Sequence, residues 1–132
     1  MIEGFTMFAI ILDDVICAAH YTRALDGTVE NIHGHNWNIR VTVTSPELNA
    51  VGMVLDFTVA KKLLREILNK YDYQNLNNIP PFNTIIPTTE HMARHFTESF
   101  QKKILEATGD EKIKVEEFQV TESPNCTAVY RP

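Results

Sequence analysis

The sequence predicts an α+β protein with the element order β-β-α-α-β-β, in which four strands form an open sheet. Two observations lead to this prediction. Apolar residues alternate with polar ones near both ends of the chain, and they recur every three to four residues in its middle. A length of 132 residues is typical of one domain, so we expect residues 1–132 to share a single core.

The first two strands are expected before residue 45. Residues Phe5 to Ala18 are rich in Ile, Phe, Val and Leu and are interrupted by Asp13 and Asp14, which predicts one long strand or two segments with a bend. In Asn36 to Thr44 every second residue is apolar, as in a strand with one buried face: Trp37, Ile39, Val41 and Val43. The polar stretch Tyr21 to Ile32 contains Asp-Gly and predicts a loop.

An amphipathic helix is expected next. It spans Phe57 to Tyr71, with Asp56 available as its N-cap. Its apolar stripe consists of Val59, Leu63, Ile67 and Tyr71. The following stretch, Asn75 to Pro87, contains three prolines and several asparagines and predicts a loop.

A second helix and two strands complete the predicted fold. The helix spans Glu90 to about Ala107, with Thr88 or Thr89 as its N-cap. Its apolar positions in register are Met92, Phe96, Phe100 and Ile104. Two closing strands, Lys114 to Thr121 and Thr127 to Arg131, are joined by a Ser-Pro-Asn turn. Because an open sheet of four strands has two unpaired edges, we expect oligomerisation across them.

Composition narrows the class of protein. The net charge of -5 argues against a nucleic-acid-binding face, which is normally basic. The longest apolar run is far shorter than the roughly 20 residues of a membrane span, and the first residues do not resemble a targeting signal, so a cytoplasmic protein without a membrane partner is expected. Two cysteines in a chain of this length do not suggest a disulfide framework.

Three histidines near the ends of the first two strands form a candidate metal site. His33 and His35 are two residues apart, so at the mouth of a strand both imidazoles project from one face, about 6.5 to 7 Å apart at the backbone. His20 follows the first strand and lies beside them if the two strands pair. Three neutral nitrogens with one open position are the ligands of a catalytic zinc ion. Surface or hydrogen-bonded structural histidines are the alternative interpretation.

A second histidine pair, His91 and His95, is spaced by four residues on the second expected helix. This spacing suits one helical face or one metal ion. No acidic residue completes the H-E-x-x-H pattern, so we do not expect a second metal there. His91 falls in the first turn of the helix and remains a candidate acid or base.

Six short motifs follow one another along the chain: A-A-H ending at His20, H-G-H-N from His33, V-L-D-F from Val54, Asp72 with the N-L-N after it, P-T-T-E from Pro87, and T-E-S around Glu122. Together they resemble the 6-pyruvoyl-tetrahydropterin synthase family over nearly the whole chain. The resemblance implies the tunnelling fold (T-fold), with an antiparallel four-stranded sheet and two helices on one face. It also implies trimers around a twelve-stranded barrel, commonly stacked as a homohexamer, which would pair the exposed edges.

The resemblance further implies a pterin substrate and roles for individual residues. The zinc ligands of the family correspond to His20, His33 and His35. Glu122 corresponds to the carboxylate that anchors the pterin, and such a group can accept two parallel N–H bonds from the pyrimidine ring. The segment that contributes to the pterin pocket across a subunit boundary corresponds to Thr88, Thr89 and Glu90.

Two positions depart from the pattern of the typical synthases. Those enzymes, and the related 6-carboxytetrahydropterin synthases, have a catalytic Cys four residues before the first histidine of H-G-H, where this chain has Val29. They also have an Asp-His pair before N-L-N, where this chain has Asp72 and Tyr73. Cys17 should point to the opposite strand face from the histidines, and Cys126 lies in the final turn. The thiolate chemistry of those enzymes is therefore not expected.

Glu30, beside Val29, completes an E-x-x-H-G-H motif. It resembles a subgroup in which Glu replaces Cys and the enzyme forms 6-hydroxymethyl-7,8-dihydropterin for folate synthesis. The hypothesis is a zinc-dependent lyase that cleaves the C1'–C2' bond of 7,8-dihydroneopterin triphosphate or monophosphate. Glu30 would be the base, and Asp72, Tyr73, His91 or Glu30 itself the acid. The alternatives are a 6-pyruvoyl- or 6-carboxytetrahydropterin synthase and a zinc-dependent pterin-binding protein without catalysis.

Overall fold

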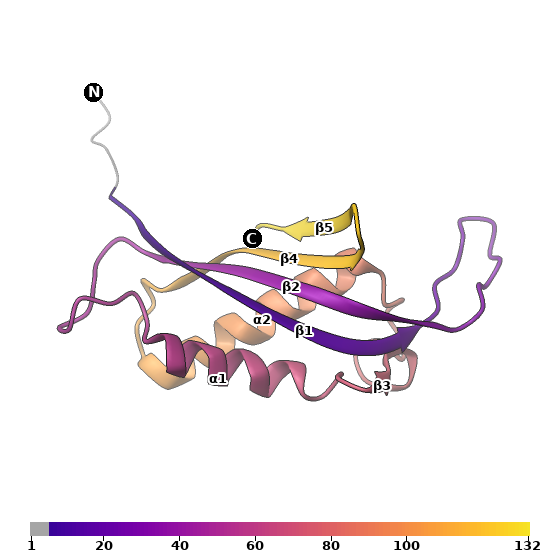
Figure 1. Ribbon diagram of the computed structural model, residues 1–132, viewed down its shortest axis with the longest axis horizontal. Coiled ribbons are helices and arrows are strands. Elements are labelled where there is room, and N and C mark those ends of the chain that lie inside the picture. Colours follow the sequence, from indigo (N-terminus) through magenta and orange to yellow (C-terminus); the bar gives the residue numbers. More distant parts are fainter. Residues whose placement is uncertain (1–5) are drawn as a thin grey trace, which may run out of the picture.

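The computed structural model describes residues 6–132, which form one twisted sheet with two helices packed on the same face (Figure 1). The sheet order is β3-β1-β2-β4-β5. The strands are β1 Phe8–His20, β2 His33–Ser45, β3 Gln74–Asn75, β4 Lys114–Ser123 and β5 Cys126–Tyr130. The helices are α1 Phe57–Leu68 and α2 Thr89–Thr108, with a 3-10 turn, η1, at Leu76–Asn78. The predicted α+β class is confirmed.

The long antiparallel pair β1–β2 carries the histidines. Its register runs without interruption from Phe8 opposite Ser45 to His20 opposite His33. The predicted strand start at Phe5 lies outside the described residues, and the strand continues to His20 rather than ending at Ala18. Similarly, β2 begins at His33 rather than Asn36. Backbone pairing between the strands therefore extends through the histidines. The strand ends predicted from apolar periodicity stopped short of them.

The sheet has a fifth strand that the sequence did not predict. β3 pairs in parallel with β1 over only two residues, in a segment expected to be loop. The side-chain amide of Asn77 strengthens this junction, because it accepts from the Tyr21 N–H at 2.9 Å and donates to the Tyr21 carbonyl at 3.1 Å. A two-residue strand has no detectable period, so only its tertiary contacts reveal it.

The core lies between the helices and the inner face of the sheet. The predicted apolar faces of β2 and α2 are fully buried, at residues Trp37, Ile39, Val41, Val43, Met92, Phe96, Phe100 and Ile104. In α1 the prediction is partly wrong, since Val59 is 41% exposed and the buried stripe is Ala60, Leu63, Leu64, Ile67 and Leu68. Tyr71 is buried as expected, but it lies beyond the end of the helix.

The helix ends follow the expected capping chemistry. Asp56 Oδ1 accepts from the Thr58 and Val59 N–H groups at 2.8 and 3.2 Å. Thr88 Oγ1 accepts from the His91 N–H at 3.1 Å, so Thr88 rather than Thr89 is the N-cap of α2. Within residues 6–132, no helix is both long enough and apolar enough to cross a membrane.

Candidate metal centre

Four side chains from three adjacent strands converge at one end of the sheet. His20 ends β1, His33 and His35 begin β2, and Glu122 lies near the end of β4. The antiparallel register sets His20 opposite His33. One ligand atom from each of the four residues lies within 4.8 Å of all the others. The expected convergence of the three histidines is therefore present, and Glu122 joins them.

Backbone carbonyls orient two of the imidazole rings. His20 Nδ1 lies 2.7 Å from the Pro87 carbonyl oxygen, and His33 Nδ1 lies 2.8 Å from the Asn31 carbonyl oxygen. A carbonyl oxygen only accepts, so in each ring Nδ1 carries the hydrogen and donates. The neutral ring then presents the lone pair of Nε2 to the centre of the cluster, as metal-binding histidines commonly do.

The inner nitrogens of the cluster lack a hydrogen-bond partner. His20 Nε2 and His35 Nε2 are buried, and neither forms a hydrogen bond within the part of the chain that is described. Glu122 Oε1 approaches them to 3.3 and 3.5 Å, but outside hydrogen-bonding geometry. Burial lowers the pKa of His35 and favours its neutral form. Lone pairs that face one another in a buried site can hold a cation, and three imidazoles with a carboxylate are a ligand set that suits zinc.

Aromatic packing supports the ligand residues. The buried Trp37 lies edge-on to His20 and His35, with ring centroids 4.8 and 4.9 Å apart. Its indole Nε1–H donates to the Ala18 carbonyl at 3.0 Å, which ties β2 to β1 beside the cluster. The His20 ring is therefore held by both a hydrogen bond and packing, and the His35 ring by packing, a preorganised arrangement for a metal ion.

Glu30 lies at the border of the histidine cluster. Its Oε1 accepts from the Thr22 backbone N–H and from Thr22 Oγ1, both at 2.8 Å. The same oxygen is 3.9 Å from His33 Nε2. The Thr22 hydroxyl, and next its N–H, lowers the pKa of Glu30 below its usual value. The carboxylate is thus ionised near neutral pH and faces the cluster from its exposed side.

The start of α2 also lies beside this cluster, because the Pro87 carbonyl that holds His20 directly precedes the helix cap. Thr88 uses its hydroxyl as the N-cap acceptor. Thr89 and Glu90 line an open pocket of about 280 Å³ together with residues of β5. The expected pterin segment therefore borders both the histidine cluster and an outer edge of the sheet.

The structure does not bring the three candidate acids to the cluster within one chain. Asp72 accepts from the Cys17 N–H at 2.9 Å and forms an ion pair with Arg65, so it is occupied at the β1–β3 edge. The Tyr73 side chain is 82% exposed. His91 Nδ1 lies 2.7 Å from the carbonyl oxygen of Ile86, and His91 is not among the four convergent side chains. Their catalytic roles stay predictions.

Three groups that support the site could not be identified from the sequence. These are the Thr22 side chain and the backbone carbonyls of Asn31 and Pro87. Carbonyl groups leave no signature in a sequence. Thr22 lies eight residues before Glu30, and only the turn of the intervening loop brings the two together. Cys17 is exposed and faces away from the buried His20, as expected.

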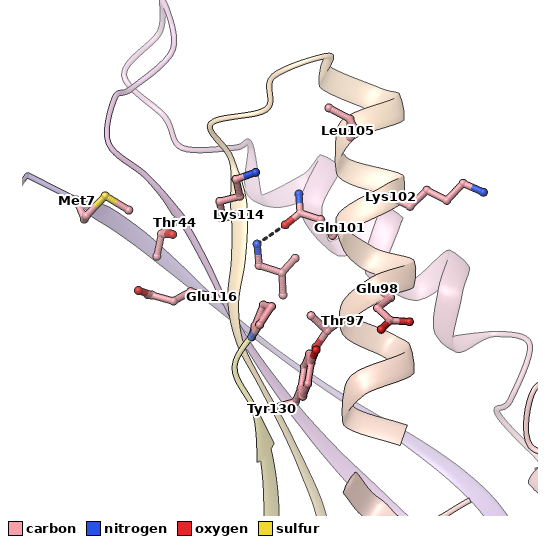
Figure 2. A pocket seen from close by; sticks show the side chains of 12 residues that line it. Met7, Thr44, Thr97, Glu98, Gln101, Lys102, Leu105, Lys114, Glu116 and Tyr130 are labelled. Atoms are coloured by element: carbon pink, nitrogen blue, oxygen red, sulfur yellow. Dashed lines mark hydrogen bonds between the residues drawn. The ribbon is translucent and has the colours of Figure 1, made fainter. Parts of the chain in front are cut away.

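A larger pocket of about 720 Å³ lies elsewhere, between α2 and the beginning of β4 (Figure 2). Its lining includes no member of the histidine cluster. There the Gln101 amide accepts from the Val115 N–H at 2.7 Å and donates to the Ile113 carbonyl at 2.9 Å, so it covers part of the β4 edge. No titratable cluster with metal-ligand geometry accompanies this pocket among the described residues.

Comparisons with known proteins agree on one family. The family described as 6-pyruvoyl tetrahydropterin synthase matches residues 9–132. The chain is 32% identical over 130 residues to the 6-carboxy-5,6,7,8-tetrahydropterin synthase of Bacillus subtilis, covering 95% of this chain and 86% of the relative. It is 34% identical over 85 residues to the dihydroneopterin monophosphate aldolase of Pyrococcus furiosus, covering 64% and 67%.

The fold comparison agrees with the sequence comparison. The structure of the Caenorhabditis elegans 6-pyruvoyl tetrahydropterin synthase superposes with a TM-score of 0.80 at 21% identity, covering 99% of both chains. This likeness confirms the T-fold. The match over residues 9–132, together with 32% identity over 95% of the chain to the Bacillus subtilis relative, shows that the chain belongs to the 6-pyruvoyl tetrahydropterin synthase family.

Proposed function

We propose that this protein is a zinc-dependent carbon–carbon lyase that converts 7,8-dihydroneopterin triphosphate or monophosphate into 6-hydroxymethyl-7,8-dihydropterin for folate synthesis. The observation that carries the proposal is Glu30, an ionised carboxylate 3.9 Å from a candidate metal ligand, beside Val29 where the typical synthases have a thiol. The similarity to a dihydroneopterin monophosphate aldolase supports it.

The metal would be held by His20, His33 and His35. Bound zinc would supply Lewis acidity to the side-chain hydroxyls of the substrate. Zinc is the ion of choice because three imidazole nitrogens with a further position are its usual catalytic ligand set. The carbonyl groups of Asn31 and Pro87 keep the ligand nitrogens of two rings directed at the ion.

Glu30 would act as the base of a retro-aldol cleavage. It removes the proton of the 2'-hydroxyl, whose oxygen becomes a carbonyl as the C1'–C2' bond breaks. The bonding electrons pass to C1' and into the C6=N5 imine of the dihydropterin ring, so no organic cofactor is needed. The lowered pKa of Glu30 keeps it ready to accept that proton at neutral pH. A proton delivered to C1' then completes the hydroxymethyl group.

The acid and the pterin-binding groups would come in part from a neighbouring subunit. We propose that subunits assemble as a homohexamer, because the outer edge of β1 is paired only over two residues by β3. Such assembly would allow Asp72, Tyr73 or His91 of a neighbouring subunit to serve as the acid. The pterin itself would be anchored by the carboxylate of Glu122 and by the segment Thr88, Thr89 and Glu90.

A product assay tests the proposal directly. Zinc-loaded protein is incubated with 7,8-dihydroneopterin triphosphate and, separately, with the monophosphate, and the pterins are separated by chromatography. We expect 6-hydroxymethyl-7,8-dihydropterin and a phosphorylated two-carbon aldehyde, which contains C2' and C3' of the substrate side chain. Release of inorganic triphosphate with 6-pyruvoyltetrahydropterin or 6-carboxytetrahydropterin would identify a synthase, and the second product would be in line with the name of the Bacillus subtilis relative. Recovery of unchanged ligand would indicate a binding protein.

Replacing Thr22 by valine removes one of the two hydrogen bonds that position the base and is expected to lower kcat about fivefold, equivalent to about 1 kcal/mol. The loss is small because the Thr22 N–H still bonds to the base. KM and zinc content should stay unchanged, and Thr22→Ser should restore the rate. In the wild type the Thr22 hydroxyl lowers the pKa of Glu30, so its removal should raise that pKa. The acidic limb of the pH–rate profile should therefore move to higher pH in the valine variant. An unmoved limb would contradict Glu30 as the titrating base.

A further inference from the structure

We propose that Glu122 is a fourth, displaceable ligand of the metal in the substrate-free protein, and that substrate must move it off the ion. This inference rests on the metal site proposed above. It adds a role for Glu122 that differs from anchoring the pterin. The two roles exclude each other in time, so the same carboxylate would serve the metal before the substrate binds and the pterin afterwards.

The distances within the cluster support coordination. Two donor atoms that are each about 2.0 to 2.2 Å from a tetrahedral zinc ion lie about 3.3 to 3.6 Å from one another. Glu122 Oε1 is 3.3 Å from His20 Nε2 and 3.5 Å from His35 Nε2. The oxygen therefore has the separation from two ligand nitrogens that a shared ion would impose.

The backbone of β4 directs Glu122 inward. In the pairing of β4 with β5, Thr121 lies opposite Thr127 and Ser123 lies opposite Cys126, which leaves Glu122 without a partner. Along β4 the buried Phe118 and Val120 alternate with more exposed residues, and Glu122 continues this alternation on the same face. This face adjoins the side of β2 that carries the histidines, so strand geometry directs the carboxylate to them, and the β-bulge frees Glu122 from pairing with β5.

The charge balance also favours coordination. Both His20 Nε2 and Glu122 Oε1 are acceptors when the imidazole is neutral, and two acceptors 3.3 Å apart repel each other unless a cation lies between them. Three neutral imidazoles leave the full double charge of a zinc ion uncompensated, and His20 is almost completely buried. The carboxylate halves that charge, while its 32% exposure leaves it room to move away.

The exchange has a mechanistic consequence. When Glu122 accepts N–H bonds from the pterin ring, it vacates the position that a side-chain hydroxyl of the same substrate needs. Binding of the ring and opening of the metal are thereby coupled, and the ion is shielded from other ligands when no pterin is present. Glu30 is held by Thr22 throughout and does not take part in the exchange.

Cobalt(II) substitution tests this inference without relying on turnover. Metal-free wild type, Glu122→Gln and the control Glu116→Gln, an exposed residue of the same strand, are titrated with Co²⁺, and the visible ligand-field bands are recorded. Affinity for Zn²⁺ is measured in parallel by competition with a chelator. We expect band shifts and an affinity loss of at least about tenfold in Glu122→Gln, since even outer-shell changes cost 10- to 100-fold. The control should match wild type.

The unreactive pterin neopterin provides the second arm. Added to the cobalt-loaded wild type, it should shift the bands, because Glu122 leaves the ion. A weaker affinity of Glu122→Gln with unchanged bands would show that the carboxylate acts only through its charge, and would overturn the inference while leaving the metal site intact. Failure of the wild type to bind Co²⁺ or Zn²⁺ would overturn both. Circular dichroism of the metal-free variants establishes that they are folded.

Discussion

Glu30→Gln is expected to lower kcat for carbon–carbon cleavage by about 100- to 10,000-fold, the usual contribution of a positioned general base. Glutamine keeps the size of the side chain and can still accept from the Thr22 N–H, so the loop should keep its conformation. It cannot take up the 2'-hydroxyl proton. Zinc content should remain at one ion per chain, because Glu30 is 3.9 Å from the nearest ligand nitrogen and does not coordinate.

The matched control for this prediction is Glu106→Gln, the same chemical change at an exposed position of α2. Rates are measured at saturating substrate with zinc quantified on the same samples. The control should retain the wild-type rate. If Glu30→Gln retained that rate with zinc bound, the base would have to be another group, and the proposal of a glutamate-dependent lyase would fail.

His35→Gln is expected to abolish both metal binding and activity. His35 Nε2 is buried and has no hydrogen-bond partner among the described residues, so a bound ion would be its partner in the proposed site. Loss of a direct ligand should cost more than the 100-fold upper range of outer-shell changes in zinc affinity. The wild-type protein treated with a chelator should show the same loss of activity, and zinc should restore it.

The control is His95→Gln, because His95 is half-buried on α2 and is hydrogen-bonded at 2.9 Å to Tyr71 rather than directed at the cluster. Zinc is counted by elemental analysis after dialysis. The control should retain the metal. Stoichiometric, tightly bound zinc in His35→Gln would mean that the ion is held elsewhere, and the assignment of the three histidines would be wrong.

The parts of the fold that depend on local periodicity were predictable. The apolar stripe of α2 and the alternating face of β2 are buried as their spacing indicates, and Asp56 and Thr88 cap helices where their side chains suggest. The end of α1 was not, since Tyr71 continues the periodic pattern but lies past the last helical residue. Tyr71 is buried because its ring packs against Phe96 of α2. An apolar residue at the helical spacing can be buried in this way whether it lies in the helix or in the turn that follows.

At the candidate site, the sequence by itself determined which reactive side chains are available, and the tertiary structure determined their geometry. His20, His33 and His35 could be proposed as ligands from their type and spacing, which are local information, and Glu30 could be singled out from its position in the E-x-x-H-G-H motif of a resembling subgroup. The approach of Glu122 to the histidines depends on the pairing of β4 beside β2.

The supporting contacts likewise arise only when distant segments meet. The Pro87 carbonyl reaches His20 across 67 positions, and the Thr22 hydroxyl reaches Glu30 across the turn of a loop. A sequence states which donors and acceptors exist. The pairing register of the strands decides which of them converge, because moving a strand by one residue turns each of its side chains to the other face.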